Sequence, residues 1–211
     1  MLKVKVCGLR DNVAEVVGLK PDYIGFIFYP KSKRYVAELP AEEIRTIPRT
    51  IQKVGVFVDQ ELEEVMHKAE RFQLNYIQLH GHESIEYCST LKKMMNIGVI
   101  KVFSGNRLPD SGLLAAYGDS IDYYLFDTRN ESYGGTGQKF DWTVIADLKL
   151  KKPIFLSGGI DLDDLERIHE RGINIFAVDV NSKFEIEPGF KDINKIERLL
   201  EARKQICDVS N

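Results

Sequence analysis

Eight short β-rich runs alternate with eight helical patterns along this chain, and this alternation constrains the fold more than any other feature. The β-rich runs lie at residues 3–7, 23–28, 53–58, 76–80, 99–103, 123–127, 154–157 and 175–180. Apolar residues at helical spacing mark segments near 11–19, 40–47, 60–73, 83–95, 110–117, 142–149, 161–171 and 191–206. Strict alternation predicts parallel strands joined by right-handed crossover helices.

Eight such units in 211 residues predict a single (β/α)₈ TIM barrel, near the lower length limit of that fold. An open doubly wound sheet is the alternative. However, CGLRDN follows the first run where a dinucleotide-binding sheet would carry its glycine-rich fingerprint. No linker or low-complexity tract divides the sequence, so we expect one domain over residues 1–211.

Composition narrows the kind of partner. The net charge is −3 and the basic residues are spread along the chain, which indicates no nucleic-acid surface and no membrane-binding face. No segment resembles a signal peptide or an apolar membrane span, so we expect a cytoplasmic protein. Cys7, Cys88 and Cys207 fit neither a disulfide framework nor a zinc site, so we expect free thiols, no metal, and a small-molecule substrate.

A TIM barrel builds its site at the carboxyl ends of its strands, and alternate residues of a strand share a face. This alternation directs polar side chains from at least five strands into the barrel: Lys5, Cys7, Gln78, His80, Lys101, Asp127 and Asp179. Barrel interiors normally hold branched apolar residues. Two interpretations therefore stay open for Lys5, Lys101 and Asp179: a buried ion network that supports the fold, or part of a site.

Two segments indicate a phosphate site. Gly158 and Gly159 follow the seventh run, and Asn181 and Ser182 follow the eighth, where many barrels bind phosphate. The glycine-rich segment YGGTGQKFDW, which includes Gly135, lacks the GK[ST] of a nucleotide P-loop. We interpret it as a lid or as backbone that approaches substrate closely, and we expect Asp141 and Asp161 to cap the helices that follow them.

The ordered motifs KVCGL, GFIFYPKSKRYV, VGVFVD, IQLHG, LFDT, YGGTGQKFDW, FLSGGI, AVDV and PGFKD resemble the phosphoribosylanthranilate isomerase family of tryptophan biosynthesis. The resemblance spans nearly the whole chain. It implies a single-domain barrel that performs an Amadori rearrangement of N-(5-phosphoribosyl)anthranilate to 1-(2-carboxyphenylamino)-1-deoxyribulose 5-phosphate without a cofactor. A monomer and a homodimer are both compatible with it.

The resemblance also implies roles for residues that match the family's motifs. The general base falls on Cys7, the general acid on Asp127, and the arginine that faces the anthranilate on Arg34. The phosphate ligands fall on Gly158, Gly159, Asn181 and Ser182. Lys5, Gln78, His80, Lys101, Gly135 and Asp179 are expected to line the site or to support it.

The eighth run is where the sequence departs from the family, which often reads VSSG there. This chain reads VNSK, so Lys183 stands near the expected phosphate and either contacts it or points to solvent. A related phosphosugar isomerase or epimerase is the alternative enzyme, but those use paired aspartates or a metal, whereas a cysteine ends the first run here. A barrel that binds a phosphosugar without turnover is the alternative outside enzymes.

Overall fold

A closed barrel of eight parallel strands forms the centre of the computed structural model, which describes residues 1–36, 39–128 and 140–209. The strands are β1 (Lys3–Cys7), β2 (Tyr23–Ile27), β3 (Gln52–Phe57), β4 (Tyr76–Leu79), β5 (Gly98–Ser104), β6 (Tyr123–Asp127), β7 (Ile154–Leu156) and β8 (Ala177–Val180). Each strand pairs with the next along the chain, and β8 pairs with β1 to close the ring. The predicted (β/α)₈ fold is confirmed.

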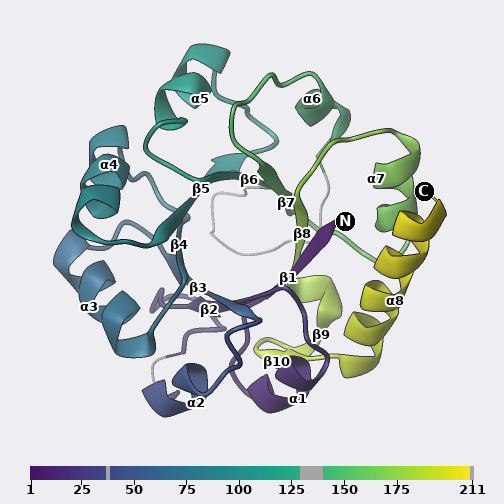
Figure 1. The fold of residues 1–211 in the computed structure, drawn as a ribbon, viewed down its shortest axis with the longest axis horizontal. Helices are drawn as coiled ribbons and strands as arrows, with labels where there is room; N and C mark the ends of the chain where they lie inside the picture. Colours follow the sequence, from purple (N-terminus) through teal and green to yellow (C-terminus); the bar gives the residue numbers. More distant parts are fainter. Residues whose placement is uncertain (37–38, 129–139, 210–211) are drawn as a thin grey trace.

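A ring of helices surrounds the barrel, as Figure 1 shows in a view along the barrel axis. The helices are α1 (Val13–Gly18), α2 (Ala41–Arg45), α3 (Leu62–Phe72), α4 (Ile85–Met94), α5 (Ser111–Tyr117), α6 (Thr143–Ala146), α7 (Asp164–Glu170) and α8 (Ile193–Val209). Each helix follows the strand of the same number, which is the connection that parallel neighbours require. None of the helices in the described ranges is both long and apolar enough to cross a bilayer.

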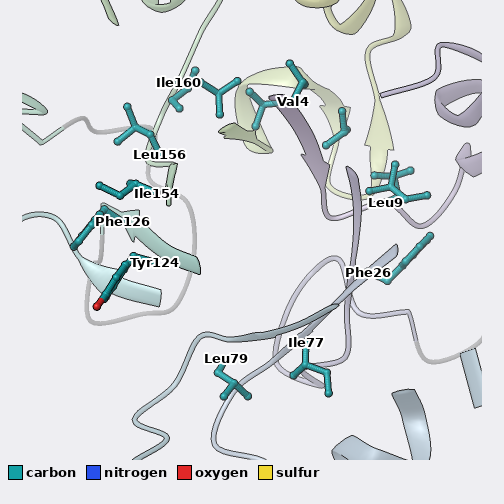
Figure 2. Close-up of a cluster of buried hydrophobic side chains, with 14 of the residues drawn as sticks. Val4, Leu9, Phe26, Ile77, Leu79, Tyr124, Phe126, Ile154, Leu156 and Ile160 are labelled. Carbon is teal, nitrogen blue, oxygen red and sulfur yellow. The ribbon is translucent and has the colours of Figure 1, made fainter. Parts of the chain in front are cut away.

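The buried apolar side chains form two layers, one on the outer surface of the barrel and one inside it. The larger layer lies between strands and helices and includes Val4, Phe26, Ile77, Leu79 and Phe126, several of which are drawn as sticks in Figure 2. The smaller layer fills the barrel interior with Tyr23, Val54, Ile100, Val102, Leu125, Phe155 and Ala177. Aromatic rings fill the interior near the amino-terminal ends of β2 and β4, where Tyr23 packs edge-on against Tyr76 and Phe155. The interior is therefore a packed core over much of its length, and Cys7 and Asp127 stand at the carboxyl ends of their strands.

Short elements after β8 were not predicted from the sequence. A 3₁₀ turn, η1 (Ser182–Phe184), leads into an antiparallel pair of strands, β9 (Glu185–Glu187) and β10 (Phe190–Lys191). Figure 1 shows this pair beside α1. The segment that joins β8 to α8 therefore contains a small hairpin.

Neither predicted aspartate is the N-cap residue of its helix. The N-cap of α6 is Trp142, and Asp141, one residue earlier, accepts hydrogen bonds from the Thr143 backbone N–H at 3.0 Å and hydroxyl at 2.8 Å at the start of the helix. The prediction for Asp161 is wrong, because α7 begins at Asp164 and, within the described part of the chain, the Asp161 carboxylate accepts from the Leu162 N–H, before the helix. A turn at 162–163 separates the two, and an aspartate pattern alone does not reveal such a turn.

Candidate active site

Lys5 and Asp179 form a buried ion pair inside the barrel. The two residues are direct partners in the β1–β8 register, and Lys5 Nζ lies 2.9 Å from Asp179 Oδ1. Burial alone would lower the pKa of Lys5, but Asp179 and Cys7 raise it above its ordinary value. The predicted inward orientation of both residues is confirmed, and Lys5 stays charged because Asp179 compensates it.

Cys7 ends β1 on the same face as Lys5, with 5% of its surface exposed. Its partner on β2 is Gly25, where a Cβ would lie 2.8 Å from the Cys7 Sγ, so glycine leaves the room that the thiol needs. Burial raises the pKa of the Cys7 thiol, Lys5 and Lys191 oppose that rise, and Asp179 adds to it. Ionisation of this thiol therefore depends on nearby cations.

Asp127 ends β6 at the same end of the barrel, with 22% of its side chain exposed. Burial, assisted by the negative charge of Asp179, raises its pKa to about 6, against hydrogen bonds from Ser157 and the Thr128 N–H and the charge of Lys5. A carboxyl group with this pKa carries a proton far more often near neutral pH than an ordinary aspartate does. Asp127 and Cys7 thus both interact electrostatically with the same Lys5–Asp179 pair.

His80 and Gln78 connect to Asp127 from β4. His80 Nε2 lies 3.5 Å from Asp127 Oδ2, and Gln78 Nε2 lies 3.4 Å from His80 Nδ1. Gln78 is buried, and its Oε1 has no hydrogen-bond partner among the described residues. The structure thus brings both predicted lining residues to the barrel end where Asp127 lies.

Lys101 does not face the barrel interior, and the prediction for it is wrong. In the β5 register it pairs with Leu79 and Tyr124, which belong to the outer apolar layer, whereas its neighbours Ile100 and Val102 fill the interior. Its Nζ lies 3.0 Å from Glu83 Oε2 and 2.9 Å from the Gly81 carbonyl oxygen. This buried ion pair supports the chain behind the barrel wall. Apart from Lys101, apolar residues occupy both faces in the middle of β5, so the strand carries no alternation from which its inward face can be read.

Replacing Lys101 by methionine is expected to lower the free energy of unfolding by about 3–5 kcal/mol, because it leaves Glu83 buried without its cation. Urea unfolding would measure the loss. The double variant Lys101→Met/Glu83→Gln should recover part of it, since a glutamine oxygen still accepts the Asp59 and Gly81 N–H groups that Glu83 accepts now. A tenfold fall in kcat in a folded Lys101→Met protein would instead return Lys101 to the site.

Arg34 lies after β2 and contacts the hairpin that follows β8. Its Nε is 2.9 Å from both carboxylate oxygens of Glu185, and its Nη2 is 2.7 Å from Oε2. Arg34 and Lys191 hold the pKa of Glu185 below its usual range despite burial. This paired geometry fixes the plane of the guanidinium group. Among the described residues, the partners of Arg34 engage Nε and Nη2, so Nη1 still has N–H groups to donate.

The residues predicted to bind phosphate lie at adjacent strand ends. Gly158 and Gly159 follow β7 with φ of +96° and +68°, a left-handed conformation that glycine adopts without strain. Asn181 and Ser182 follow β8, the neighbouring strand. The Asn181 Oδ1 accepts a hydrogen bond from Lys191 Nζ at 2.9 Å, so this oxygen is already engaged. Lys183 is exposed, and Gly135 lies outside the described residues.

Glu185 and Lys191 are the charged neighbours that sequence reasoning missed. They flank a Pro-Gly turn in FEIEPGFKD, and that turn with extended residues on both sides is the signal of a short hairpin. The hairpin carries two charged groups to the end of β1, with Lys191 fully buried. Their contacts place them beside Arg34 and Asn181.

A closed parallel barrel with a thiol, a carboxyl group and buried cations at one set of strand ends defines a TIM-barrel enzyme. The family model described as N-(5'phosphoribosyl)anthranilate (PRA) isomerase matches residues 4–202. The chain therefore belongs to the phosphoribosylanthranilate isomerase family.

Individual relatives agree with the family model. N-(5'-phosphoribosyl)anthranilate isomerase of Parabacteroides distasonis is 43% identical over 203 residues, which cover 94% of this chain and 91% of that protein. The crystal structure of the Thermotoga maritima enzyme is similar with a TM-score of 0.84 at 35% identity and covers 97% of this chain and 100% of its own. A solved enzyme of this name in complex with reduced 1-(o-carboxyphenylamino)-1-deoxyribulose 5-phosphate has a TM-score of 0.78 at 32% identity, with coverage of 97% and 100%.

Proposed function

We propose that this protein is a phosphoribosylanthranilate isomerase, which converts N-(5-phosphoribosyl)anthranilate into 1-(2-carboxyphenylamino)-1-deoxyribulose 5-phosphate in tryptophan biosynthesis. The observation that carries the proposal is the pair formed by Cys7 and Asp127. In a chain of this family, one thiol and one carboxyl group of raised pKa end β1 and β6 and share the electrostatic field of Lys5 and Asp179. The rearrangement requires one base and one acid.

Asp127 is the proposed general acid for opening the ribose ring. Its carboxyl proton passes to the ring oxygen as the bond from that oxygen to C1 breaks, and the lone pair of the anthranilate nitrogen forms the C=N bond of a Schiff base. A carboxyl group with a pKa of about 6 is protonated in roughly one molecule in ten at pH 7. That fraction is about a hundred times larger than for an ordinary aspartate.

Cys7 is the proposed general base for the second step. Its thiolate removes the proton from ribose C2, and the electrons of that C–H bond form a C1=C2 double bond while the C=N electrons return to nitrogen. The resulting enolamine tautomerises to the ketone. Atoms and electrons balance within the substrate, so the chain has only to move protons and to hold both ends of the ligand.

The proposed binding residues follow from the family resemblance and from their positions. Arg34 faces the anthranilate carboxylate, with Glu185 fixing the plane of its guanidinium group. Gly158, Gly159, Asn181 and Ser182 hold the phosphate at the ends of β7 and β8, where TIM barrels commonly bind it. Because the Asn181 Oδ1 is engaged with Lys191, the contact that we propose for Asn181 uses its N–H donors. Lys5, Asp179, His80 and Gln78 support the two reacting groups.

We expect the purified full-length chain, treated with EDTA, to convert phosphoribosylanthranilate generated in situ from anthranilate and phosphoribosyl pyrophosphate. Chromatography that separates the ketone product from its isomer would measure turnover, with a kcat of about 1–10³ s⁻¹. Failure of a well-folded sample to convert the substrate would contradict the proposal. Binding of the reduced product analogue without any turnover would instead favour a phosphosugar-binding barrel.

We further propose that residues 1–211 act as one domain in the cytoplasm, as a monomer or a homodimer. Analytical ultracentrifugation of the purified chain would distinguish the two oligomeric states. Both reacting groups lie on strands of a single barrel, so neither state requires a second copy to supply the acid or the base.

A further inference from the structure

Lys191 is a buried lysine for which the proposed chemistry has no role so far. It ends β10 with 0% of its surface exposed. Its Nζ lies 2.6 Å from Glu185 Oε1 and 2.9 Å from Asn181 Oδ1. Burying an ammonium group costs several kcal/mol unless it is paired, so a chain that uses lysine here needs a reason beyond packing.

The backbone of Lys191 is fastened to the loop that follows Cys7. The Asn12 side chain donates to the Lys191 carbonyl oxygen at 3.0 Å and accepts from the Lys191 N–H at 2.9 Å. The backbone N–H groups of Arg10 and Asp11 both donate to the Gly189 carbonyl oxygen at 3.1 Å. These four contacts hold the hairpin against the β1–α1 loop.

Asn181 places the Lys191 ammonium group near the end of β1. The Oδ1 of Asn181, which accepts from Lys191, packs so closely on Gly8 that a Cβ at Gly8 would lie 2.7 Å from it. Gly8 directly follows Cys7 in the chain. The charge of Lys191 is accordingly one of those that lower the pKa of the Cys7 thiol.

The balance of charges around Cys7 gives this lysine its importance. Lys5 and Asp179, which face the thiol from β1 and β8, form a neutral pair. At the hairpin, the carboxylate of Glu185 forms ion pairs with both Lys191 and Arg34.

Among the described groups in contact at the hairpin, two cations face one anion, which leaves an excess of one positive charge, while Arg10 and Asp11 beside the hairpin pair with each other. In the reactive form, Asp127 on β6 carries the proton that it donates, and its raised pKa favours that form over an ordinary aspartate, so it adds no charge beside the Lys5–Asp179 pair. A thiolate at Cys7 would neutralise the excess positive charge at the hairpin.

We propose that Lys191 is a positioning residue for Cys7, whose buried ammonium group supplies the net positive charge that stabilises the thiolate. Glu185 and Asn181 hold that ammonium group in place. Burial lowers the pKa of Lys191 to about 8, and Glu185 opposes this decrease, so the ammonium form predominates near neutral pH. The inference deepens the proposed function and rests on Cys7 as its base.

The test is a titration of the Cys7 thiol that needs no turnover. Thiolate absorbance is followed against pH in the full-length protein, and the spectrum of the Cys7→Ser variant is subtracted to remove Cys88 and Cys207. In Lys191→Gln, whose amide still donates to Glu185 and Asn181, we expect the thiol pKa to rise by about one unit, a tenfold loss of thiolate at a given pH. The kcat/KM near neutral pH should fall about tenfold and recover at higher pH.

Lys195→Gln is the matched control, because it removes the same charge from a lysine that donates to the exposed Lys183 carbonyl oxygen instead. Lys191→Met serves as a second variant if Lys191→Gln does not fold, since Glu185 keeps its paired contacts with Arg34. The inference is overturned if the Lys191 variants titrate like the control, even when their turnover falls. A shifted titration in a protein that shows no turnover would support the inference and contradict only the proposed function.

Discussion

Replacing Cys7 by serine is expected to lower kcat by about 10²–10⁴-fold, the usual contribution of a positioned general base. A hydroxyl group does not ionise in the pH range in which a cation-stabilised thiol does, so the C2 proton loses its acceptor. KM should change little, because no proposed phosphate or carboxylate contact is altered. Stopped or continuous steady-state assays with in situ substrate would measure both constants.

Cys88→Ser is the control for that substitution. Cys88 is fully buried in α4, and burial raises the pKa of its thiol to about 11, so the same exchange tests the cost of a buried hydroxyl group without touching the strand ends. We expect a loss of about 1–3 kcal/mol in the free energy of unfolding and an unchanged kcat. Full activity of Cys7→Ser would show that another group accepts the proton.

Replacing Asp127 by asparagine is expected to lower kcat by a similar factor of about 10²–10⁴ and also to stabilise the fold. The folded protein raises the pKa of this carboxyl from 3.8 to about 6. It therefore binds the proton more tightly than the unfolded chain does, and stability falls as the pH rises between these values. Above about pH 6 the ionised carboxylate costs up to about 3 kcal/mol, which the neutral amide avoids.

Urea unfolding at several pH values would test this prediction, because the stability gain of Asp127→Asn should grow from near zero below about pH 4 to about 1–3 kcal/mol above about pH 6. Asp122→Asn is the matched control, since Asp122 immediately precedes β6 at the opposite end of the barrel. It pairs with Lys92 at 2.7 Å and accepts from the Val99 N–H at 2.8 Å. That variant should lose stability and keep its kcat. A destabilised Asp127→Asn protein would contradict the assigned cost of ionisation.

The sequence predicts the barrel well because its signal is repeated in every unit. Each strand run after the first lies between two helical patterns, so an error of one to three residues at a boundary, as at α6, does not change the topology. The inward faces of β1 and β8 are also predictable, because Lys5 and Asp179 stand between valines that pack outward. Polar residues between apolar ones mark a face.

The same reasoning fails at Lys101 and at the hairpin for physical reasons. Both faces of β5 carry apolar residues, so its single lysine suggests the wrong face as the inward one. Glu83, which neutralises this lysine, lies in a loop whose position the sequence spacing does not reveal. The contacts of Lys191 with Asn12 and Asn181 depend on how the hairpin after β8 folds against the loop between β1 and α1. Local propensity contains no information about such long-range contacts.

The closing of the barrel between β1 and β8 also orders events during synthesis. Lys5 and Cys7 are among the first residues to leave the ribosome, yet Asp179, the partner of Lys5, is made 174 residues later. Until β8 docks, the nascent first strand holds a lysine in a position that has no neutralising anion. Contacts between such distant residues form late in folding. The environment that we propose ionises the thiol is thus completed by the final segment of the chain, so that reactivity at Cys7 arises only when the whole barrel has been made.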